Sequence, residues 1–247
     1  MKVSKILALT LAAVMLVMCF AACGEKKDDN VIVMATSADF PPYEYYENDE
    51  IVGIDIDIMN AVCEKIGMTL QPQDMSFDSV IGAAQTGKAD IAMSGITITE
   101  DRKNMVNFTI PYTTEAQSII VVSGGEIAEK ADLDGKKIGV QINTTGDMQV
   151  TEEFGDNAVE RFQNGALAVE SLKNSKIDCV VIDGEVAKAL VAANEGLEII
   201  ADAYSLEEYA IALAKDNTEL LEKINGALEE LLADGTIDAI KAKYTEE

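Results

Sequence analysis

The chain has 247 residues, with 44 acidic and 19 basic side chains and a formal net charge of −25 at pH 7. So acidic a protein repels polyanions, which excludes nucleic-acid binding as a function class. It contains no histidine, so the commonest metal ligand and the usual imidazole acid or base are missing. We therefore expect neither a transition-metal site nor a cofactor.

Residues 1–22 have the pattern of an export signal: a basic start with Lys2 and Lys5, an apolar run over 6–20, and two alanines. Cys23 follows directly, and residues 20–23 resemble a bacterial lipobox, with Phe20 where leucine is usual. This predicts cleavage before Cys23 and a lipid on its sulfur. An ordinary secretory signal and an uncleaved anchor are the alternatives, although the apolar run is short for a membrane span. Residues 23–30 are expected to form a polar tether.

Strand and helix patterns alternate from residue 31 onward, which predicts an α/β protein. Apolar residues recur every four positions from Ile54 to Ile66, so this helix should bury one face, while Asp55 and Asp57 should face solvent. The first block comprises strands over 31–36, 69–71 and 89–93 and helices over 54–66 and 78–85.

A second alternating block follows, and its pattern repeats that of the first. In both blocks a helix end, a tight turn and an apolar strand lead to a polar residue and a glycine, at Ser94 and at Asp183. The similarity predicts two lobes of related build, and ligands in such sheets bind beyond the carboxyl ends of the strands. The second block comprises strands over 137–141, 159–162 and 177–182 and helices over 146–154, 167–173 and 185–194. The chain ends with an extended run over 209–213 and helices over 218–233 and 236–243.

Residues 94–102, Ser-Gly-Ile-Thr-Ile-Thr-Glu-Asp-Arg, gather hydroxyls, free backbone groups and an arginine where a buried strand ends. Gly95 permits close approach of a ligand to the backbone, and Thr99 is suited to cap a short helix that carries Arg102. A guanidinium holds a carboxylate through two parallel bonds, so the cluster suits a small zwitterion. The alternative is that Arg102 pairs with its acidic neighbours on a solvated helix start.

Five segments in a fixed order carry a resemblance that covers residues 31–244. They are Ala35-Thr36 with Phe40-Pro41-Pro42-Tyr43-Glu44, residues 52–57 (VGIDID), residues 94–99 with Arg102, residues 134–146, and Asp183 after a buried strand. In these segments the chain resembles the bacterial family 3 solute-binding proteins, the extracytoplasmic receptors of ABC importers for polar amino acids.

The resemblance implies a periplasmic-binding-protein type II fold, in which two α/β lobes are joined by two hinge strands. Lobe 1 would comprise residues 31–115 and 207–247, and lobe 2 residues 116–206. The implied partners are a free amino acid, an ABC permease and, through Cys23, the outer face of the cell membrane. The protein would be a monomer and not an enzyme.

The resemblance also implies the ligand contacts. Arg102 would bind the α-carboxylate with help from Ser94 and the backbone N–H groups of Thr97 and Thr145. Asp183, the Gly95 carbonyl and the Thr97 hydroxyl would bind the ammonium group. The side-chain pocket would be formed by Phe40 and Phe77, with Gln141 at its edge.

Several alternatives remain open at this point. Phe40 and Phe77 are also suited to be ordinary core aromatics, and Asp183 to be the N-cap of the helix that follows it. Asn143 replaces the glycine usual before the paired threonines, and asparagine tolerates the left-handed backbone that this position requires.

Specificity is less constrained. Receptors for cationic amino acids commonly carry an aspartate where Ser37 stands, and Asp39 and Glu44 are the candidates to compensate for its absence. We therefore predict a polar or cationic L-amino acid as the ligand.

Three other functions compete with this prediction. A cyclohexadienyl-dehydratase-like enzyme shares the architecture but needs an acid or base aimed at the reacting carbon. An amino acid sensor usually continues into a second membrane span and an output module, whereas this sequence stops at Glu247. A structural envelope lipoprotein would leave Arg102 and Asp183 without a common ligand. Cys63 and Cys179 are expected to be two separate core thiols.

Overall fold

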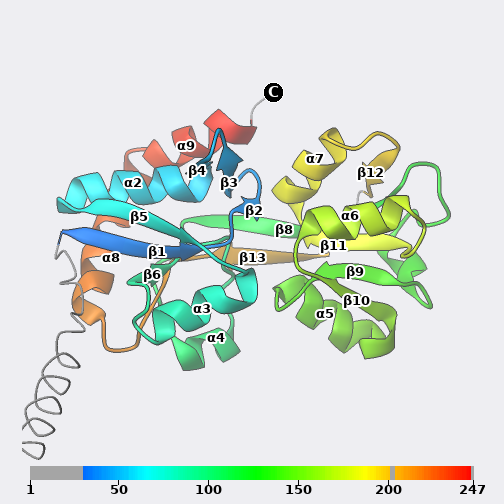
Figure 1. Ribbon diagram of the computed structural model, residues 1–247, viewed down its shortest axis with the longest axis horizontal. Helices are drawn as coiled ribbons and strands as arrows, with labels where there is room; N and C mark the ends of the chain where they lie inside the picture. Colours follow the sequence, from blue (N-terminus) through cyan, green and yellow to red (C-terminus); the bar gives the residue numbers. More distant parts are fainter. Residues whose placement is uncertain (1–29, 201–203, 246–247) are drawn as a thin grey trace, which may run out of the picture. The chain divides into compact units, whose positions relative to one another are not determined.

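The computed structural model describes residues 30–200 and 204–245, and it contains two main sheets, each with helices on both faces (Figure 1). The predicted signal segment and the lipidation site at Cys23 lie outside the described residues, as does most of the tether. Within the described ranges no helix is long and apolar enough to cross a membrane.

The first sheet has the strand order β5-β1-β6-β14-β7. β1 and β6 are parallel, and β14 is antiparallel to both β6 and β7. One face carries the core formed with α2 and α8, and the other packs against α3. The elements are β1 (Val31–Thr36), α2 (Ile54–Ile66), β5 (Thr69–Asp74), α3 (Phe77–Gln85), β6 (Ile91–Ala92), α4 (Glu100–Met105), β7 (Asn107–Phe108), β14 (Ala212–Leu213), α8 (Thr218–Ala233) and α9 (Thr236–Thr245).

Helix α2 confirms the predicted four-residue apolar repeat, because Ile54, Ile58 and Val62 are fully buried. It ends at Gly67, whose φ of 72° gives the left-handed cap that glycine adopts without steric cost. One expectation for this helix was wrong. Asp55 does not face solvent but is completely buried, because its carboxylate accepts hydrogen bonds from the Gly95 N–H and the Tyr112 hydroxyl.

The second sheet has the order β10-β9-β11-β8-β12, with β13 paired to β8. Alternate residues of β11 face opposite layers, as a pleated strand requires: Val180 and Ile182 join the core with α6 and α7, and Cys179 and Val181 join the core with α5. The elements are β8 (Thr113–Val122), β9 (Ile138–Gln141), α5 (Thr145–Phe154), β10 (Val159–Phe162), α6 (Gly165–Lys173), β11 (Cys179–Asp183), α7 (Gly184–Ala192), β12 (Leu197–Ile199) and β13 (Ser205–Tyr209), with short 3-10 turns at Lys130–Leu133 and Asp156–Ala158.

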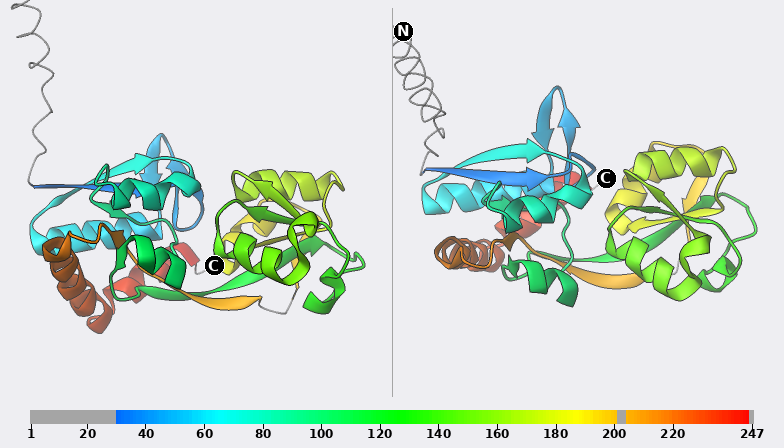
Figure 2. Two further views of the ribbon diagram at one scale, coloured as in Figure 1. Left: turned by 90° about the horizontal axis from the view of Figure 1, so that it is seen from below. Right: turned by 60° about the horizontal axis from the view of Figure 1, so that its bottom comes forward.

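An antiparallel ribbon of β8 and β13 connects the two sheets (Figure 2). Its register pairs Tyr209 with Thr113 at one end and Ser205 with Gln117 at the other. These are the two hinge strands that the two-lobed fold requires. The predicted lobe boundaries at 115/116 and 206/207 fall inside this ribbon and stay a prediction.

A small third sheet was missed by the sequence interpretation. It consists of β2 (Asp39–Phe40), β3 (Glu44–Glu47) and β4 (Glu50–Val52) in antiparallel order. Its strands are too short to show a two-residue repeat. Other differences are smaller: strand 89–93 shortens to β6, and the extended run 209–213 divides into β13 and β14. Cys63 and Cys179 are buried free thiols, as predicted.

The parallel strands of each sheet end near the same place. In the first sheet β6 leads directly to Ser94 and Gly95, and in the second β9 and β11 end at Gln141 and Asp183. The polar residues singled out in the sequence therefore lie at the carboxyl ends of strands, where α/β proteins bind ligands.

Candidate functional site

A pocket with an empty volume of about 330 Å³, which includes its opening to solvent, lies where these strand ends meet. Its lining comes from both sheets and from the hinge ribbon. Eight of the nine predicted ligand-binding residues line it: Phe40, Phe77, Gly95, Thr97, Arg102, Gln141, Thr145 and Asp183. The structure adds Gln117, Thr144, Ile182 and Tyr209.

Arg102 is buried in this pocket and has no ion-pair partner among the described residues. Thr99 caps α4 by accepting from the Arg102 N–H at 3.2 Å. The guanidinium donates to the Thr97 carbonyl at 2.9 Å and, across to the other sheet, to the Asn143 carbonyl at 3.1 Å. The alternative was that Arg102 pairs with its acidic neighbours on a solvated helix start. It is wrong, because Arg102 is buried and its neighbour Glu100 pairs with Lys103 at 2.9 Å. Burial lowers the pKa of Arg102 to about 10, so it stays charged at neutral pH.

Asp183 ends β11 and is also buried. One carboxylate oxygen accepts from the Val186 N–H at 3.0 Å, and the other accepts from the Tyr209 hydroxyl at 2.9 Å. The side chain is therefore the N-cap of α7, as one interpretation of the sequence predicted, and it also lines the pocket. Its contact with a ligand ammonium group stays a prediction. Burial above all, and then the charge of Glu115, raises the pKa of Asp183 to about 7.

Gly95 separates two aromatic rings at the pocket wall. Its φ is +54°, and a Cβ built there would lie 3.0 Å from the Phe40 ring and 3.2 Å from the Tyr209 ring. Only glycine fits this position without moving a ring. Phe40 stacks on Tyr43 at a centroid distance of 5.8 Å, and the Arg102 guanidinium carbon lies 5.8 Å from the centroid of Phe77.

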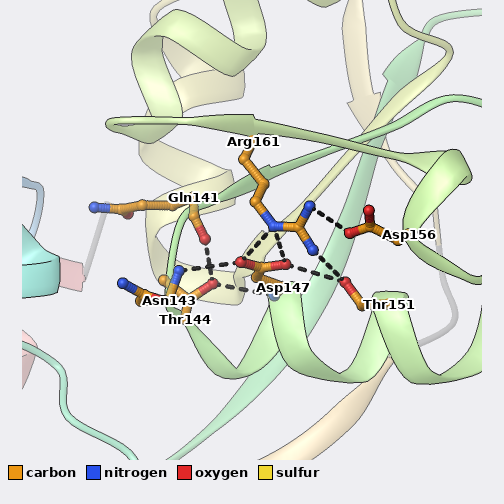
Figure 3. Close-up of polar contacts among 7 residues, drawn as sticks. All are labelled: Gln141, Asn143, Thr144, Asp147, Thr151, Asp156 and Arg161. Carbon is orange, nitrogen blue, oxygen red and sulfur yellow. Dashed lines mark hydrogen bonds and ion pairs between the residues drawn. The ribbon is translucent and has the colours of Figure 1, made fainter.

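The loop before α5 contributes Thr144 to the pocket lining, and Figure 3 shows the polar contacts that order this loop. Asn143 adopts the predicted left-handed backbone, with φ of 62°. The Thr144 hydroxyl donates to the Gln141 carbonyl at 2.8 Å and accepts from the Asp147 N–H at 3.2 Å. Asp147 accepts from the Asn143 N–H at 3.1 Å and forms an ion pair with Arg161 at 2.9 Å. This network fixes the carbonyl that Arg102 contacts.

Glu207 is a pocket-side residue that sequence reasoning missed. It lies on β13, is buried, and accepts from the Thr97 and Thr145 hydroxyls, each at 2.7 Å. The amides of Gln117 and Gln149 donate to the same carboxylate at 3.2 and 2.9 Å. The sequence did contain a signal. Residues two apart on a strand face the same side, so Glu207 faces inward with Tyr209, and both are buried.

Ser94 is the one predicted site residue outside the pocket lining. Its hydroxyl donates to Glu44 at 2.7 Å and accepts from the Ser37 N–H at 3.0 Å, which engages it behind the pocket wall. The structure therefore shows Ser94 joined to Glu44 and Ser37, and its predicted ligand contact stays a prediction.

Fold and site together define the class: a two-lobed α/β solute-binding protein with a polar pocket beside its hinge strands. The sequence profile of the bacterial extracellular solute-binding proteins, family 3, matches residues 32–247. The chain belongs to this family.

Known relatives agree with this assignment. The chain is 33% identical over 247 residues to the arginine-binding extracellular protein ArtP of Bacillus subtilis (strain 168), with 96% of each chain covered. A solved structure of an ancestral arginine-binding protein bound to glutamine superposes with a TM-score of 0.84 at 40% identity, covering 89% of this chain and 100% of that chain. The arginine-, lysine-, histidine-binding protein ArtJ of Geobacillus stearothermophilus gives a TM-score of 0.83 at 32% identity, covering 87% and 95%.

Proposed function

We propose that this protein is the extracytoplasmic receptor of an ABC importer and that it captures a polar or cationic L-amino acid between its two lobes. Arg102 binds the α-carboxylate, and Asp183 binds the ammonium group with the Gly95 carbonyl. A ligand that contacts both lobes favours the closed arrangement over the open one. The closed arrangement is the form delivered to the permease.

The observation that carries this proposal is the buried guanidinium of Arg102 without a carboxylate partner among the described residues. The guanidinium donates to two carbonyls, and the charge of Glu207 acts on it, but it forms no ion pair in the described structure. Burial of a charge without a direct partner is costly, and a ligand carboxylate supplies that partner. Asp183 supplies the complementary charge from the other lobe. Opposite charges from two lobes match the two ends of a zwitterion.

Specificity follows from the rest of the lining. The Gln141 side-chain oxygen is buried without a donor in the described structure, so it suits a ligand amide or guanidinium N–H. Phe40 and Phe77 supply apolar surface for a carbon chain or a guanidinium face. Glu44 cannot supply the charge for a cationic side chain, because it is fully buried against Ser94. The relatives named for arginine, histidine and cystine support a polar or cationic ligand.

The site residues and the cellular context belong to the same proposal. Residues 1–22 act as an export signal and Cys23 carries the lipid anchor on the outer face of the membrane. The body works as a monomer that meets its permease there. Metabolic labelling with a radioactive fatty acid tests the anchor: the wild-type protein should be labelled and Cys23→Ser should not.

A thermal-shift screen of residues 24–247 against the twenty amino acids tests binding. Ligand at a hundred times its Kd adds about 2.7 kcal/mol to the free energy of unfolding. One or a few L-amino acids should raise the melting temperature, and Arg102→Ala or Asp183→Asn should abolish the rise. Lys103→Ala is the matched control for Arg102, because Lys103 is the next residue and pairs with Glu100 at the surface. A flat profile for every amino acid would refute the proposal.

We also propose that the protein binds without chemical conversion. The ionisable side chains of the pocket are Arg102, Asp183 and Tyr209, and the first two are matched to the charged ends of the ligand. Incubation with prephenate or arogenate, followed by a product assay, separates binding from dehydratase activity. Turnover that Asp183→Asn abolishes would assign the protein to the enzyme class instead.

A further inference from the structure

Two carboxyl groups are completely buried directly behind the pocket wall. Glu44 begins β3 and Asp55 lies in the first turn of α2, and both have no solvent exposure. They come from different elements but meet behind the Ser94–Gly95 segment. Neither touches the proposed ligand, so the binding function does not explain why two acids stand there.

The hydrogen bonds of this pair are divided unevenly between its oxygens. Glu44 Oε1 accepts from the Ser94 hydroxyl at 2.7 Å. Asp55 Oδ2 accepts from the Gly95 N–H at 2.9 Å and from the Tyr112 hydroxyl at 3.0 Å. The remaining oxygens, Glu44 Oε2 and Asp55 Oδ1, are buried and have no donor when both groups are ionised. A buried acceptor without a donor costs about 1–3 kcal/mol, and more when it is charged.

The surroundings of the pair contain no compensating cation. In the described part of the chain no basic side chain forms an ion pair with Glu44 or Asp55. The nearby Lys241 forms its ion pair with Glu115, at 3.2 Å. The titratable side chains that act on the pair are acidic or phenolic: Asp39 on β2, Tyr112 before β8 and Glu115 on β8.

Two carboxylates in one dry site cannot both stay ionised. Burial and then the charge of Asp55 raise the pKa of Glu44 well above its ordinary value. Burial also raises the pKa of Asp55, to about 6, against the lowering effect of its bonds to Gly95 and Tyr112. Each side chain affects the pKa of the other. Glu44 Oε2 and Asp55 Oδ1 are both buried without a donor, so one proton between the two groups satisfies both.

We propose that Glu44 and Asp55 share a single proton at neutral pH and, as an acid–carboxylate pair, position Gly95 in the pocket wall and Ser94 directly behind it. The shared proton joins the two oxygens that lack another donor. The other oxygen of each group then binds one residue of this segment: Glu44 accepts from the Ser94 hydroxyl and Asp55 accepts from the Gly95 N–H. The pocket role rests on the proposed function, whereas the proton itself can be tested without any ligand.

The test compares Glu44→Gln with the wild-type protein, because glutamine supplies a permanent donor and retains an acceptor for Ser94. Chemical unfolding is measured from pH 7 to pH 8.5 on unliganded protein. In the unfolded chain both acids are ionised throughout this range, so folding of the wild type takes up one proton at the pair. Its unfolding equilibrium constant should therefore rise tenfold more per pH unit than that of Glu44→Gln.

Two further variants complete the design. Asp55→Asn should remove the same proton from the other side and show the same reduced slope, which keeps the test valid if Glu44→Gln does not fold. Asp57→Asn is the matched control, because Asp57 lies on the same helix but pairs with Lys243 near the surface. It should keep the wild-type slope.

Direct observation of the proton needs no variant. Carboxyl ¹³C spectra of the labelled wild-type protein at pH 7.5 should show one buried acid in its protonated form that is missing in Glu44→Gln or Asp55→Asn. Equal slopes for wild type and both variants, or a wild-type spectrum with every carboxyl ionised, would overturn the proposal. Ligand binding plays no part in these readouts, so the proton proposal can fail while the receptor function stands, and the reverse.

Discussion

Replacing Glu207 by glutamine perturbs a carboxylate that contacts both lobes. In the structure one oxygen accepts from Thr97, Thr145 and Gln117, and the other from Gln149. A glutamine has one oxygen and one NH₂ group, so one of the two acceptor positions becomes a donor and the other belongs to a neutral amide. The hydrogen bonds to a charged group are therefore lost, even where a neutral bond replaces them.

The expected magnitude follows from that loss. A hydrogen bond to a charged group contributes about 1.5–3 kcal/mol. Because the bonds to Thr97 and Thr145 join the two lobes, their loss destabilises the closed arrangement, which is the one that the ligand requires. Glu207→Gln should therefore raise the Kd for the amino acid about 10- to 150-fold.

Isothermal titration calorimetry with the best ligand of the thermal-shift screen measures this change. Glu208→Gln is the matched control, since Glu208 is the next residue of β13, faces solvent and should leave Kd unchanged. An unchanged or lower Kd for Glu207→Gln would refute the reasoning, because it would mean that the carboxylate competes with the ligand for the threonine hydroxyls.

Three further predictions concern individual groups. The pKa of Asp183 near 7 means that the ligand ammonium must displace a proton at lower pH, so Kd measured by titration should rise about tenfold per pH unit below pH 7, and a Kd that stays constant there would contradict this role. The unliganded protein should conversely lose stability as the pH rises through 7, because the folded state holds this proton more tightly than the unfolded chain. Arg161→Ala should weaken binding only about fivefold in the same calorimetric assay, because its partly exposed ion pair with Asp147 orients a loop and touches no ligand, and a larger loss would give Arg161 a direct role. Gly95→Ala should lower the free energy of unfolding in urea by about 1 kcal/mol or more, because it forces a Cβ against the Phe40 ring at positive φ, whereas Gly82→Ala, with nothing within 4 Å, should not.

Local sequence patterns were sufficient to predict much of the fold. The apolar repeat of α2 and the strong amphipathic pattern of α8 gave these helices their observed positions, because each has one wide buried face. The short strands β2, β3 and β4 escaped prediction, since two to four residues carry no readable period. Their pairing depends on contacts that only the folded chain provides.

The candidate site shows the same division. Arg102 and Asp183 were identifiable because a motif places each at the end of a buried strand, and the structure brings both to one pocket. Asp55 was misplaced at the surface, since a charged residue in a first helical turn usually faces water. Its partners, Gly95 and Tyr112, are 40 and 57 residues away in the chain. Glu207 was missed for the same reason: its contacts come from three other elements.

The most direct test of the central claim is a crystal structure of the body with a bound amino acid, chosen by the thermal-shift screen. The account predicts that the ligand α-carboxylate lies on the guanidinium of Arg102 and that its ammonium group lies on Asp183. A ligand bound elsewhere, or one bound in this pocket with its carboxylate away from Arg102, would contradict the account.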